Sequence, residues 1–445
     1  MSPLRPDTRH QLDLIARRAQ STGRVPGLLA AVAHSGSLSW VGAAGRAHLR
    51  REDPLDSHTP FPIASNTKMF VAAVIMALRD QGRLRLEDTL EEHVPGTAHG
   101  SLTIRSMLSH VSGLQREAPG GVWESLAFPD REALLADLGD AERIGPAHTR
   151  WHYSNLCFAL LGEIITRLDG GDWFASVQRR ILDPLGMRET GNGAPPAAVG
   201  RDLAGAYHVP PWSDVPDEEP PVDLGATAPA GSMVSTVADL ARWGGFLADP
   251  DAAVLHPDSV EEMCTPVALA SGFAMGYGLG VIVVPRGERQ WVGHTGGMPG
   301  AVTGVFTDRA SGVSVVAFMN SSQAPSPAAL ALDLGEKLLA SEPPLPPVWT
   351  PGESVPPEFA SLLGVWFSEG RRFEFSVRQG RLEARGERDT VASRFVEVSS
   401  DTHRAVEGPE RGELLRLHRD ENGVVARMTW AGYPFTREPV PFSHP

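Results

Sequence analysis

The chain has 445 residues, of which 42% are hydrophobic and 21% are charged, and its formal net charge is −14. These values are typical of a folded protein with room for two domains, and they exclude a chain that is disordered throughout. The excess of acidic over basic residues repels phosphate groups, so we expect neither a nucleic-acid partner nor a membrane partner.

The first elements predicted along the chain are a helix and a β-hairpin. Pro6–Thr22 has the charged and apolar faces of an amphipathic helix. Two apolar runs follow, Gly27–His34 and Leu38–Arg46, and the turn residues at 35–37 indicate a hairpin between them. A second helix is predicted to begin at about Ser65 and to run to Arg79.

The middle of the chain mixes helices with loops, and strands return near residue 290. The segment Val209–Leu224 is rich in proline and acidic residues, which predicts an irregular loop. Strands are predicted at Gln290–Val292, Ala301–Thr307 and Val313–Met319, before a closing helix at Pro327–Ala340. Because strands from both ends flank a helical middle, we predict an α+β domain with a cleft where its two parts meet.

A proline-rich stretch marks the predicted domain boundary. Seven prolines lie within residues 341–357, which suits an extended linker over 342–357 between domains 1–341 and 358–445. Beyond the linker, Phe359–Phe442 contains short alternating runs with turn signals at 379–380 and 422–423. These runs, at Arg372–Val377, Arg381–Arg385, Glu413–His418 and Val424–Trp430, predict a small antiparallel β-barrel.

Several signals bear on the cellular compartment and on bound metals. Met1–Gln20 is charged and lacks the apolar core of a secretory signal, and the apolar run Val25–Ala33 is too short to span a membrane. We therefore expect a cytoplasmic protein. The two cysteines, Cys157 and Cys264, have no CxxC or cysteine–histidine spacing, so we expect buried thiols and neither a metal site nor a cofactor.

Lysine is scarce, and one lysine stands in a chemically suggestive place. Lysine occurs only at Lys68 and Lys337, although the chain has 40 basic residues. Ser65 precedes Lys68 by three residues, so on a helix both side chains project from one face. A desolvated lysine can lose its proton, as arginine cannot, and can then activate a serine hydroxyl. Lys337, on the closing helix, is interpreted as a residual lysine without a special role.

Two later motifs give this pair its context. Tyr153-Ser154-Asn155 precedes an apolar helical run, and His294-Thr295-Gly296-Gly297 is predicted to lie where a strand ends. With them the chain resembles the penicillin-recognising serine hydrolases, which include class C β-lactamases, D-alanyl-D-alanine peptidases, D-aminopeptidases and esterases. The segments that carry the resemblance are PIASNTK (62–68), MLSHVSGL (107–114), WHYSN (151–155), DPLGMRET (183–190), PAGSMVSTVADLARW (229–243), GYGLG (276–280) and GHTGGMPG (293–300).

The resemblance implies a β-lactamase/transpeptidase-like fold and a role for each motif residue. It implies that Ser65 becomes acylated, that Lys68 takes its proton, and that Tyr153 shuttles a proton as phenol or phenolate. It implies that Asn155 binds Lys68 or the substrate amide. His294, Thr295, Gly296 and Gly297 would border the substrate, and the N–H groups of Ser65 and Gly297 would form the oxyanion hole.

Structural roles stay open for the same side chains. Tyr153 could be a packed aromatic residue, Asn155 a helix cap, and His294 a histidine satisfied within a strand. His110, in MLSHVSGL, is expected to be structural. Trp291, Phe306 and Phe318 are expected in the core.

The sequence departs from the β-lactamases at His294. Most β-lactamases of this fold carry lysine there, where its charge pairs with a substrate carboxylate, whereas histidine is largely neutral at pH 7. We therefore predict a serine hydrolase that acts through an acyl-enzyme on small esters or short peptides, as an esterase or D-aminopeptidase-like enzyme. A weak β-lactamase, a D,D-carboxypeptidase and a non-catalytic binding scaffold of the same fold are the alternatives.

Two surface features have open interpretations. The acidic loop residues Asp214, Asp217, Glu218 and Glu219 could attract a substrate amine, although a solvated excursion is favoured. The C-terminal barrel resembles lipocalin-like domains through Leu363-Gly364-Val365-Trp366 near its start. It is hypothesised to cover the cleft or to mediate homo-oligomer contacts.

Overall fold

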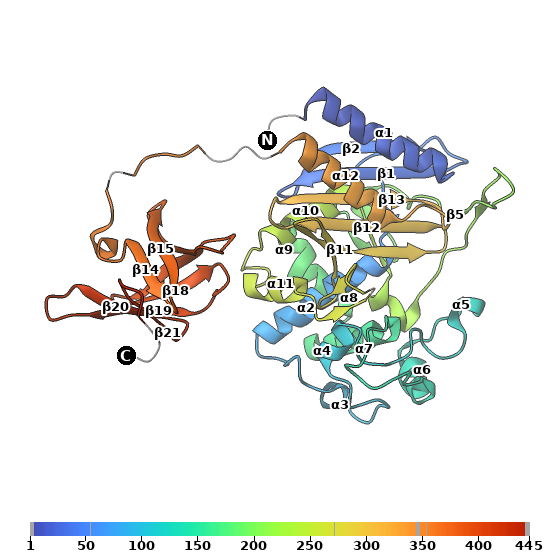
Figure 1. Ribbon diagram of the computed structural model, residues 1–445. Helices are drawn as coiled ribbons and strands as arrows, with labels where there is room; N and C mark the ends of the chain where they lie inside the picture. The colour runs from blue at the N-terminus through green and yellow to red at the C-terminus, as the bar shows by residue number, and fades with distance from the viewer. Residues whose placement is uncertain (1–3, 54, 271, 344–347, 353, 441–445) are drawn as a thin grey trace. The chain divides into compact units, whose positions relative to one another are not determined.

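The computed structural model describes residues 4–440 except 54, 271, 344–347 and 353 (Figure 1). The chain divides into two units, Met1–Pro344 and Leu345–Pro445. The predicted linker over 342–357 and the predicted end of the barrel at Phe442 lie partly outside the described residues.

In the first unit, most helices come from the middle of the sequence, and most strands come from its two ends. The helices are α1 (Pro6–Thr22), α2 (Thr67–Asp80), α3 (Leu90–His93), α4 (Ile104–Leu108), α5 (Val122–Ser125), α6 (Arg131–Ala136), α7 (Asn155–Asp169), α8 (Trp173–Val177), α9 (Asp183–Leu185), α10 (Val237–Ala248), α11 (Pro257–Cys264) and α12 (Pro327–Ser341). The main strands are β1 (Gly27–His34), β2 (Ser37–Gly45), β8 (Ala268–Leu269), β9 (Gly276–Tyr277), β10 (Ile282–Arg286), β11 (Arg289–Met298), β12 (Ala301–Asp308) and β13 (Val313–Met319).

These main strands form one antiparallel sheet in the order β2-β1-β13-β12-β11-β10-β9-β8. The N-terminal strand β1 pairs with β13 along its whole length, so that Leu28 lies opposite Met319 and His34 opposite Val313. The expectation that both ends of the sequence build one sheet is therefore confirmed. Short strands elsewhere form a three-stranded sheet of β3 (Phe61–Pro62), β4 (Gly191–Asn192) and β7 (Met233–Ser235), and a pair of β5 (Tyr207–His208) and β6 (Asp217–Glu218).

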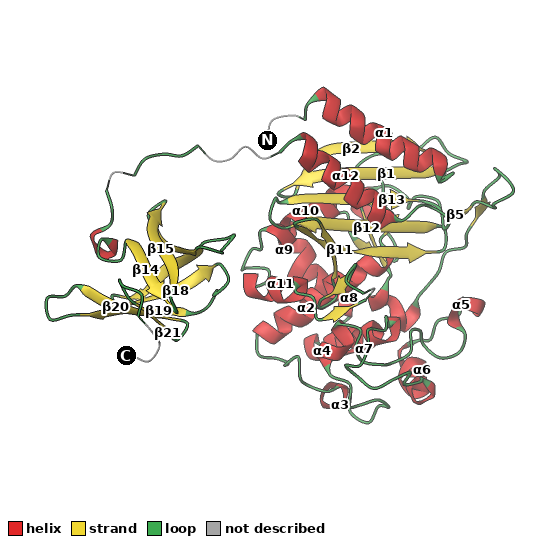
Figure 2. Cartoon of the chain, viewed as in Figure 1, coloured by secondary structure: helices red, strands yellow, loops and turns green. Residues whose placement is uncertain are grey.

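Helices cover both faces of the large sheet (Figure 2). Alternate residues of a strand point to opposite faces, and the two buried clusters follow this period. Leu28, Ala30 and Val32 of β1 pack in one cluster with buried residues of α1 and α12, whereas Leu29 and Ala31 pack in the other with α2, α7 and α10. The sheet is thus the middle layer between two helical layers, and the unit has the predicted β-lactamase/transpeptidase-like fold.

Most of the predicted elements agree with the structure in their bounds. The helix Pro6–Thr22 is confirmed residue by residue, and the hairpin turn consists of Ser35 and Gly36, both with positive φ. The predicted strand Gln290–Val292 was too short, because β11 extends through Met298. Trp291, Phe306 and Phe318 are fully buried, as predicted. No helix among the described residues has the length and apolar character needed to cross a bilayer.

The second unit is an eight-stranded antiparallel barrel that is nearly closed. Its strands are β14 (Gly364–Ser368), β15 (Arg371–Arg378), β16 (Arg381–Gly386), β17 (Ser393–Ser399), β18 (Thr402–Glu407), β19 (Leu414–Arg419), β20 (Val425–Trp430) and β21 (Tyr433–Phe435). They pair in sequence order, and the backbone groups of Phe367 in β14 and of Thr436, directly after β21, form two hydrogen bonds of 2.7 and 3.0 Å that join the first strand to the last. The predicted small antiparallel barrel is therefore confirmed.

An arginine–tryptophan pair links the first and last segments of this barrel. The Arg437 guanidinium lies 3.9 Å from the ring centroid of Trp366 and donates to the carbonyl oxygens of Ser361, Leu363 and Val365. Trp366 is fully buried, and its indole N–H donates to the Leu362 carbonyl at 2.7 Å. The first and last segments of the unit are thus tied together around one buried aromatic side chain.

Candidate active site

Ser65 lies on a tight turn that precedes α2. Residues Ala64–Asn66 form a 3₁₀ turn, and α2 begins at Thr67, so the predicted helix start at Ser65 was two residues early. Ala64 has a φ of +47°, in the left-handed region that non-glycine residues seldom occupy. This strained backbone is held by its neighbours, because Thr67 Oγ1 donates to the Ala64 carbonyl at 2.7 Å. Ser65 remains partly exposed at the turn.

Lys68 is fully buried and reaches back to Ser65. Its Nζ lies 3.2 Å from Ser65 Oγ and 2.8 Å from Asn155 Oδ1, and it also donates to the Ala230 carbonyl. No carboxylate forms an ion pair with Lys68 among the described residues. Burial therefore lowers the pKa of Lys68 well below its usual value, with the nearby Glu117 charge acting in the opposite direction. An amine in this state can accept a proton.

Tyr153 stands on the other side of Lys68. Lys68 Nζ lies 4.9 Å from the centroid of the Tyr153 ring, and the Arg116 guanidinium lies 4.8 Å from the same centroid. Burial raises the pKa of the Tyr153 phenol, and a hydrogen bond from Ser65 opposes this effect. The phenol is thus protonated at neutral pH.

The Tyr153 segment is fixed where α7 begins. Ser154 caps the helix, since its side chain accepts from the Cys157 N–H at 3.2 Å. Asn155, for which a capping role was open, is the first residue of α7, and its amide faces Lys68.

The carboxylate of Glu117, which the sequence analysis did not single out, orients Asn155. Asn155 Nδ2 donates to Glu117 Oε1 at 2.7 Å. Because a carboxylate only accepts, the amide nitrogen of Asn155 must face Glu117 and its oxygen must face Lys68. Arg116 Nε lies 3.4 Å from the same Glu117 oxygen. The role of this charged pair depends on how its loop packs against α7, so its residue types alone gave no signal.

The motif around His294 forms the last part of a strand that ends at Met298, so its predicted placement where a strand ends is confirmed. His294, Thr295, Gly296 and Gly297 all belong to β11. A Cβ atom at Gly296 would lie 2.2 Å from the Ile63 carbonyl oxygen, so only glycine lets β11 approach the turn that carries Ser65. At Gly297 a Cβ would meet nothing within 4 Å. Gly297 therefore faces open space, whereas Gly296 faces the protein.

His294 is buried and neutral. Its Nε2 lies 3.0 Å from the Tyr277 hydroxyl, and its Nδ1 lies 2.5 Å from the Thr295 carbonyl oxygen. Burial, followed by the charge of Lys68, lowers the pKa of His294 to about 3. The sequence analysis predicted a largely neutral histidine from its ordinary pKa, and the enclosed position strengthens that expectation.

These groups border a cavity of about 600 Å³. Its polar wall includes Ser65, Tyr153, Asn155, Arg116 and Glu117. Aromatic and aliphatic side chains form the remaining wall, namely Trp123, Trp151, Met275, Tyr277 and Ile282. His294, Thr295 and Gly297 also line the cavity, and Gly296 does not. The cavity thus places Ser65, which is bonded to the buried Lys68, and the Tyr153 phenol beside an apolar surface that can accept an acyl group.

The acidic loop is not part of this cavity in the described chain. Asp214 pairs with Arg24 at 2.9 Å, and Glu218 lies 3.7 Å from Arg50. Their charges face solvent and neighbouring arginines, which supports a solvated excursion.

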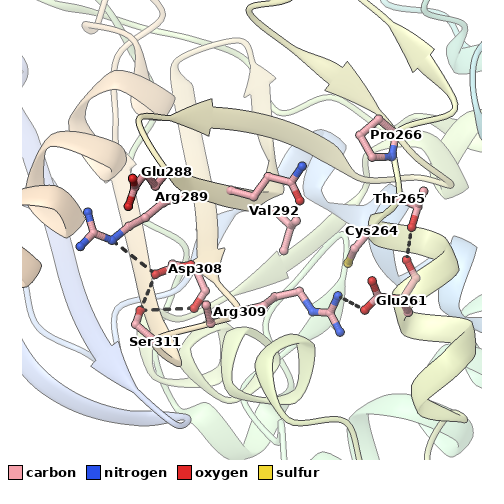
Figure 3. Close-up of a pocket in the computed structure, with 12 residues that line it drawn as sticks. Glu261, Cys264, Thr265, Pro266, Glu288, Arg289, Val292, Asp308, Arg309 and Ser311 are labelled. Atoms are coloured by element: carbon pink, nitrogen blue, oxygen red, sulfur yellow. Dashed lines mark hydrogen bonds and ion pairs between the residues drawn. The ribbon is translucent and has the colours of Figure 1, made fainter. Parts of the chain in front are cut away.

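The remaining candidate groups have structural surroundings. Cys157 and Cys264 are buried and unpaired, and burial raises the pKa of both thiols, that of Cys264 to about 12. No cluster of three metal-binding side chains occurs in the described part of the chain. A second cavity of about 620 Å³ lies beside Cys264 and the first half of β11 (Figure 3). Four of its charged side chains are paired, Arg309 with Glu261 at 2.7 Å and Arg289 with Asp308 at 3.8 Å.

Comparisons with known families match both units. The family described as Beta-lactamase matches residues 12–339, and a family described as a domain of unknown function, DUF7586, matches residues 355–437. Putative beta-lactamase-like 1 of Homo sapiens is 29% identical over 295 residues, which cover 61% of this chain and 56% of that protein. Penicillin-binding protein 4* of Bacillus subtilis (strain 168) is 28% identical over 286 residues, 61% of this chain and 63% of its own length. The chain thus spans less than two thirds of either relative.

Solved structures share the fold over one or both units. A D-stereospecific amidohydrolase from Streptomyces sp. is 25% identical with a TM-score of 0.63, over 74% of this chain and 98% of its own. The octameric penicillin-binding protein homologue from Pyrococcus abyssi is 21% identical with a TM-score of 0.65, over 96% of this chain and 99% of its own. The first likeness spans about the length of the N-terminal unit, and the second extends to nearly the whole chain.

Proposed function

The chain belongs to the Beta-lactamase family, and from that premise we propose that it is a serine hydrolase that acts through an acyl-enzyme on small esters or short peptides and amides. One observation carries the proposal: a buried Lys68 amine lies 3.2 Å from the hydroxyl of a partly exposed Ser65 in a substrate-sized cavity. That distance is within reach for direct proton transfer.

In the proposed first step, Ser65 attacks a carbonyl carbon of the substrate. The neutral Lys68 amine takes the hydroxyl proton as the new C–O bond forms, and the negative charge moves to the carbonyl oxygen. Backbone N–H groups of Ser65 and Gly297 would stabilise that oxyanion. Both residues line the cavity, and the open space at Gly297 leaves room for the oxygen.

In the proposed later steps, the proton leaves through Tyr153. The Tyr153 phenol is hydrogen bonded with Ser65 and packs beside Lys68, so it can pass a proton to the leaving alcohol or amine. Water then attacks the carbonyl carbon of the acyl-enzyme. Tyr153 and Lys68 transfer protons in the reverse direction, from the water to the departing Ser65 oxygen. Asn155 keeps Lys68 oriented and can bind a substrate amide.

The walls of the cavity favour an apolar acyl group without a carboxylate. Trp123, Trp151 and Met275 offer apolar surface, and His294 has both ring nitrogens bonded within the protein. This feature disfavours the alternatives of a weak β-lactamase and a D,D-carboxypeptidase, because both act on substrates with a carboxylate near the scissile bond.

A hydrolysis screen with intact-mass detection tests the proposed function. We expect turnover of p-nitrophenyl butyrate and a mass increase of one butyryl group on Ser65. Nitrocefin should be hydrolysed about tenfold or more slowly than p-nitrophenyl butyrate, because the neutral His294 offers no positive charge to its carboxylate. If no ester, aminoacyl amide or β-lactam acylates the protein, the non-catalytic scaffold becomes the better interpretation.

Among the possible esters and amides, we favour substrates with a free amine, because the carboxylate of Glu117 lines the cavity. Its Oε1 accepts from Asn155 and lies 3.4 Å from Arg116 Nε, whereas no hydrogen bond to its Oε2 occurs among the described residues. The side chain is 25% exposed and lines the cavity. An ammonium group of a substrate would bind this oxygen through a charge-assisted hydrogen bond.

A pair of D-aminoacyl p-nitroanilides, one with a free amine and one acetylated, tests this subclass. We expect kcat/KM to favour the free amine by about tenfold or more, since a charged hydrogen bond contributes about 1.5–3 kcal/mol. Glu117→Gln keeps an acceptor for Asn155 and should abolish the preference. Asp214→Asn, in the exposed acidic loop, is the matched control and should keep it. Equal values for both substrates in the unmodified protein would contradict an amine site.

The domain boundaries, the lipocalin-like relationship, the cytoplasmic location and homo-oligomerisation remain proposals. The eight antiparallel strands that pair in sequence order support the lipocalin-like interpretation. The mass of the full chain in solution tests the oligomer directly.

A further inference from the structure

Three buried rings from three separate segments lie in a row behind the cavity. His110 follows α4, Tyr277 belongs to β9, and His294 belongs to β11. Their exposed fractions are 0%, 0% and 1%. His110 Nε2 lies 3.1 Å from the Tyr277 hydroxyl oxygen, which lies 3.0 Å from His294 Nε2. One phenol thus bridges two imidazoles.

The hydrogen bond from the Ser154 backbone to His110 fixes which group donates and which accepts along the row. The Ser154 backbone N–H donates to His110 Nδ1 at 3.1 Å, and a backbone N–H can only donate. In a neutral His110 the proton is therefore on Nε2, which donates to Tyr277. The Tyr277 hydroxyl accepts that bond and donates its own hydrogen to His294 Nε2. That leaves the proton of His294 on Nδ1, which faces the Thr295 carbonyl oxygen at 2.5 Å.

The surroundings keep every member of the row uncharged. Burial lowers the pKa of His110 well below its usual value and raises the pKa of Tyr277. Burial also lowers the pKa of His294. The titratable groups that face the row from neighbouring elements are Lys68 of α2, Arg116 after α4, and His152 and Tyr153 before α7. With all three rings neutral, one arrangement of protons satisfies all four hydrogen bonds.

We propose that His110, Tyr277 and His294 form a fixed hydrogen-bond relay, with Tyr277 as a specificity-determining positioning residue. The relay holds His294 as its Nδ1–H tautomer, with both ring nitrogens turned to protein partners. The position where lysine stands in most β-lactamases then offers no N–H to a substrate carboxylate. This inference rests on the proposed function, and it names the feature that selects against anionic acyl groups.

The relay also connects the two sides of the site. His110 holds the Tyr153 segment twice, because its carbonyl accepts from the His152 N–H at 2.7 Å and its ring accepts from the Ser154 N–H. The ring centroids of His110 and Tyr153 are 4.2 Å apart. His110 has a φ of +57°, a strained conformation that these contacts maintain. A weakened relay should therefore displace Tyr153, and it should change kcat more than KM for a neutral ester.

Imidazole nitrogen NMR on the ¹⁵N-labelled full chain tests the tautomers without any need for activity. From pH 5 to 9 we expect His294 protonated at Nδ1 alone and His110 at Nε2 alone, with assignments from His294→Gln and His110→Gln. In Tyr277→Phe, which removes only the bridging hydroxyl, His294 should show a mixture of tautomers. A His294 that carries its proton at Nε2, or that titrates within this range in the unmodified chain, would overturn the relay.

Kinetics with two esters of equal acyl length test the specificity. We expect the unmodified protein to prefer p-nitrophenyl butyrate over p-nitrophenyl hemisuccinate, and Tyr277→Phe to narrow that ratio by about tenfold, because the freed His294 nitrogen can donate to the succinyl carboxylate. For butyrate, kcat should fall about tenfold with KM changed less. An unchanged ratio in a folded Tyr277→Phe variant would overturn the specificity role.

Tyr207→Phe is the matched control for loss of a buried phenol hydroxyl. Tyr207 is 2% exposed, lies outside the cavity-lining set, and accepts from the Leu49 N–H at 2.9 Å. It should lower the thermal midpoint about as much as Tyr277→Phe and leave the tautomers and the ester ratio unchanged. If neither ester is hydrolysed, the proposed function fails, while the NMR result still decides whether the relay exists.

Discussion

Replacing Ser65 with alanine is expected to lower kcat for p-nitrophenyl butyrate by about 10⁴-fold or more and to remove the acyl adduct. The reason is that, among the described residues, Ser65 carries the only hydroxyl with a hydrogen bond to Lys68 Nζ. The hydroxyl of Thr67, one residue before Lys68, donates to the Ala64 carbonyl and accepts from the Met233 N–H. Stopped-flow and steady-state assays measure kcat, and intact mass measures the adduct.

Ser259→Ala is a suitable control for the Ser65 experiment. Ser259 lies on α11, and its hydroxyl donates to Asp80 at 2.6 Å. It is not one of the cavity-lining residues, so loss of the Ser259 hydroxyl should leave kcat unchanged. Normal turnover by Ser65→Ala would show that another group is the nucleophile. Lost turnover with a persistent adduct would point to a different acylated residue and would also contradict the assignment.

The local part of this site could be predicted from the sequence. A three-residue spacing between Ser65 and Lys68 places both on one side of a helical turn, and this needs no knowledge of the fold. The scarcity of lysine added weight, because Lys68 is fully buried whereas Lys337 is half-buried on α12. The exact helix start was missed because Ala64–Asn66 adopt a 3₁₀ turn, which is compatible with the same residues as the first turn of an α-helix.

The non-local part of the site could not be predicted from residue types. The Ala230 carbonyl that accepts from Lys68 is a backbone group, so no side chain signals it. Glu117 and Tyr277 gain their roles only when the loop after α4 and strand β9 meet α7 and β11. Gly296 was expected to border the substrate, yet it serves the close approach of β11 to Ile63. Such a contact depends on how two distant segments pack.

In the C-terminal barrel, too, some features could be predicted from local sequence signals and others could not. The two-residue turn Gln379-Gly380, with φ values of 52° and 75°, was predicted because glycine in a hairpin turn is a strong local signal. Strands β17 and β18 were not predicted. Their pairing shifts register between Arg394 and Phe395 and again between Glu397 and Ser399, and such bulges break the alternation that identifies a strand.

Replacing Lys68 with arginine is expected to abolish acylation of Ser65, with a fall in kcat/KM of about 10³-fold or more. Arginine keeps a positive charge but does not release its proton in proteins, so it can donate to Asn155 yet cannot accept the proton of Ser65. Lys68→Ala should be equally inactive. Activity in the arginine variant with none in the alanine variant would show that the site needs a charge and not a base.

The pH dependence of kcat/KM gives the same test in the unmodified protein. A base works when it is deprotonated, so kcat/KM should rise with pH through the pKa of Lys68. Burial lowers this pKa far below 10.5, and the rise should therefore be complete well before the pH at which an exposed lysine loses its proton. Glu117 stabilises the charged amine, so Glu117→Gln should move the rise to lower pH. A rise that stays near pH 10.5 would mean that Lys68 is solvated and charged in the free enzyme, and the general-base role would then have to be abandoned.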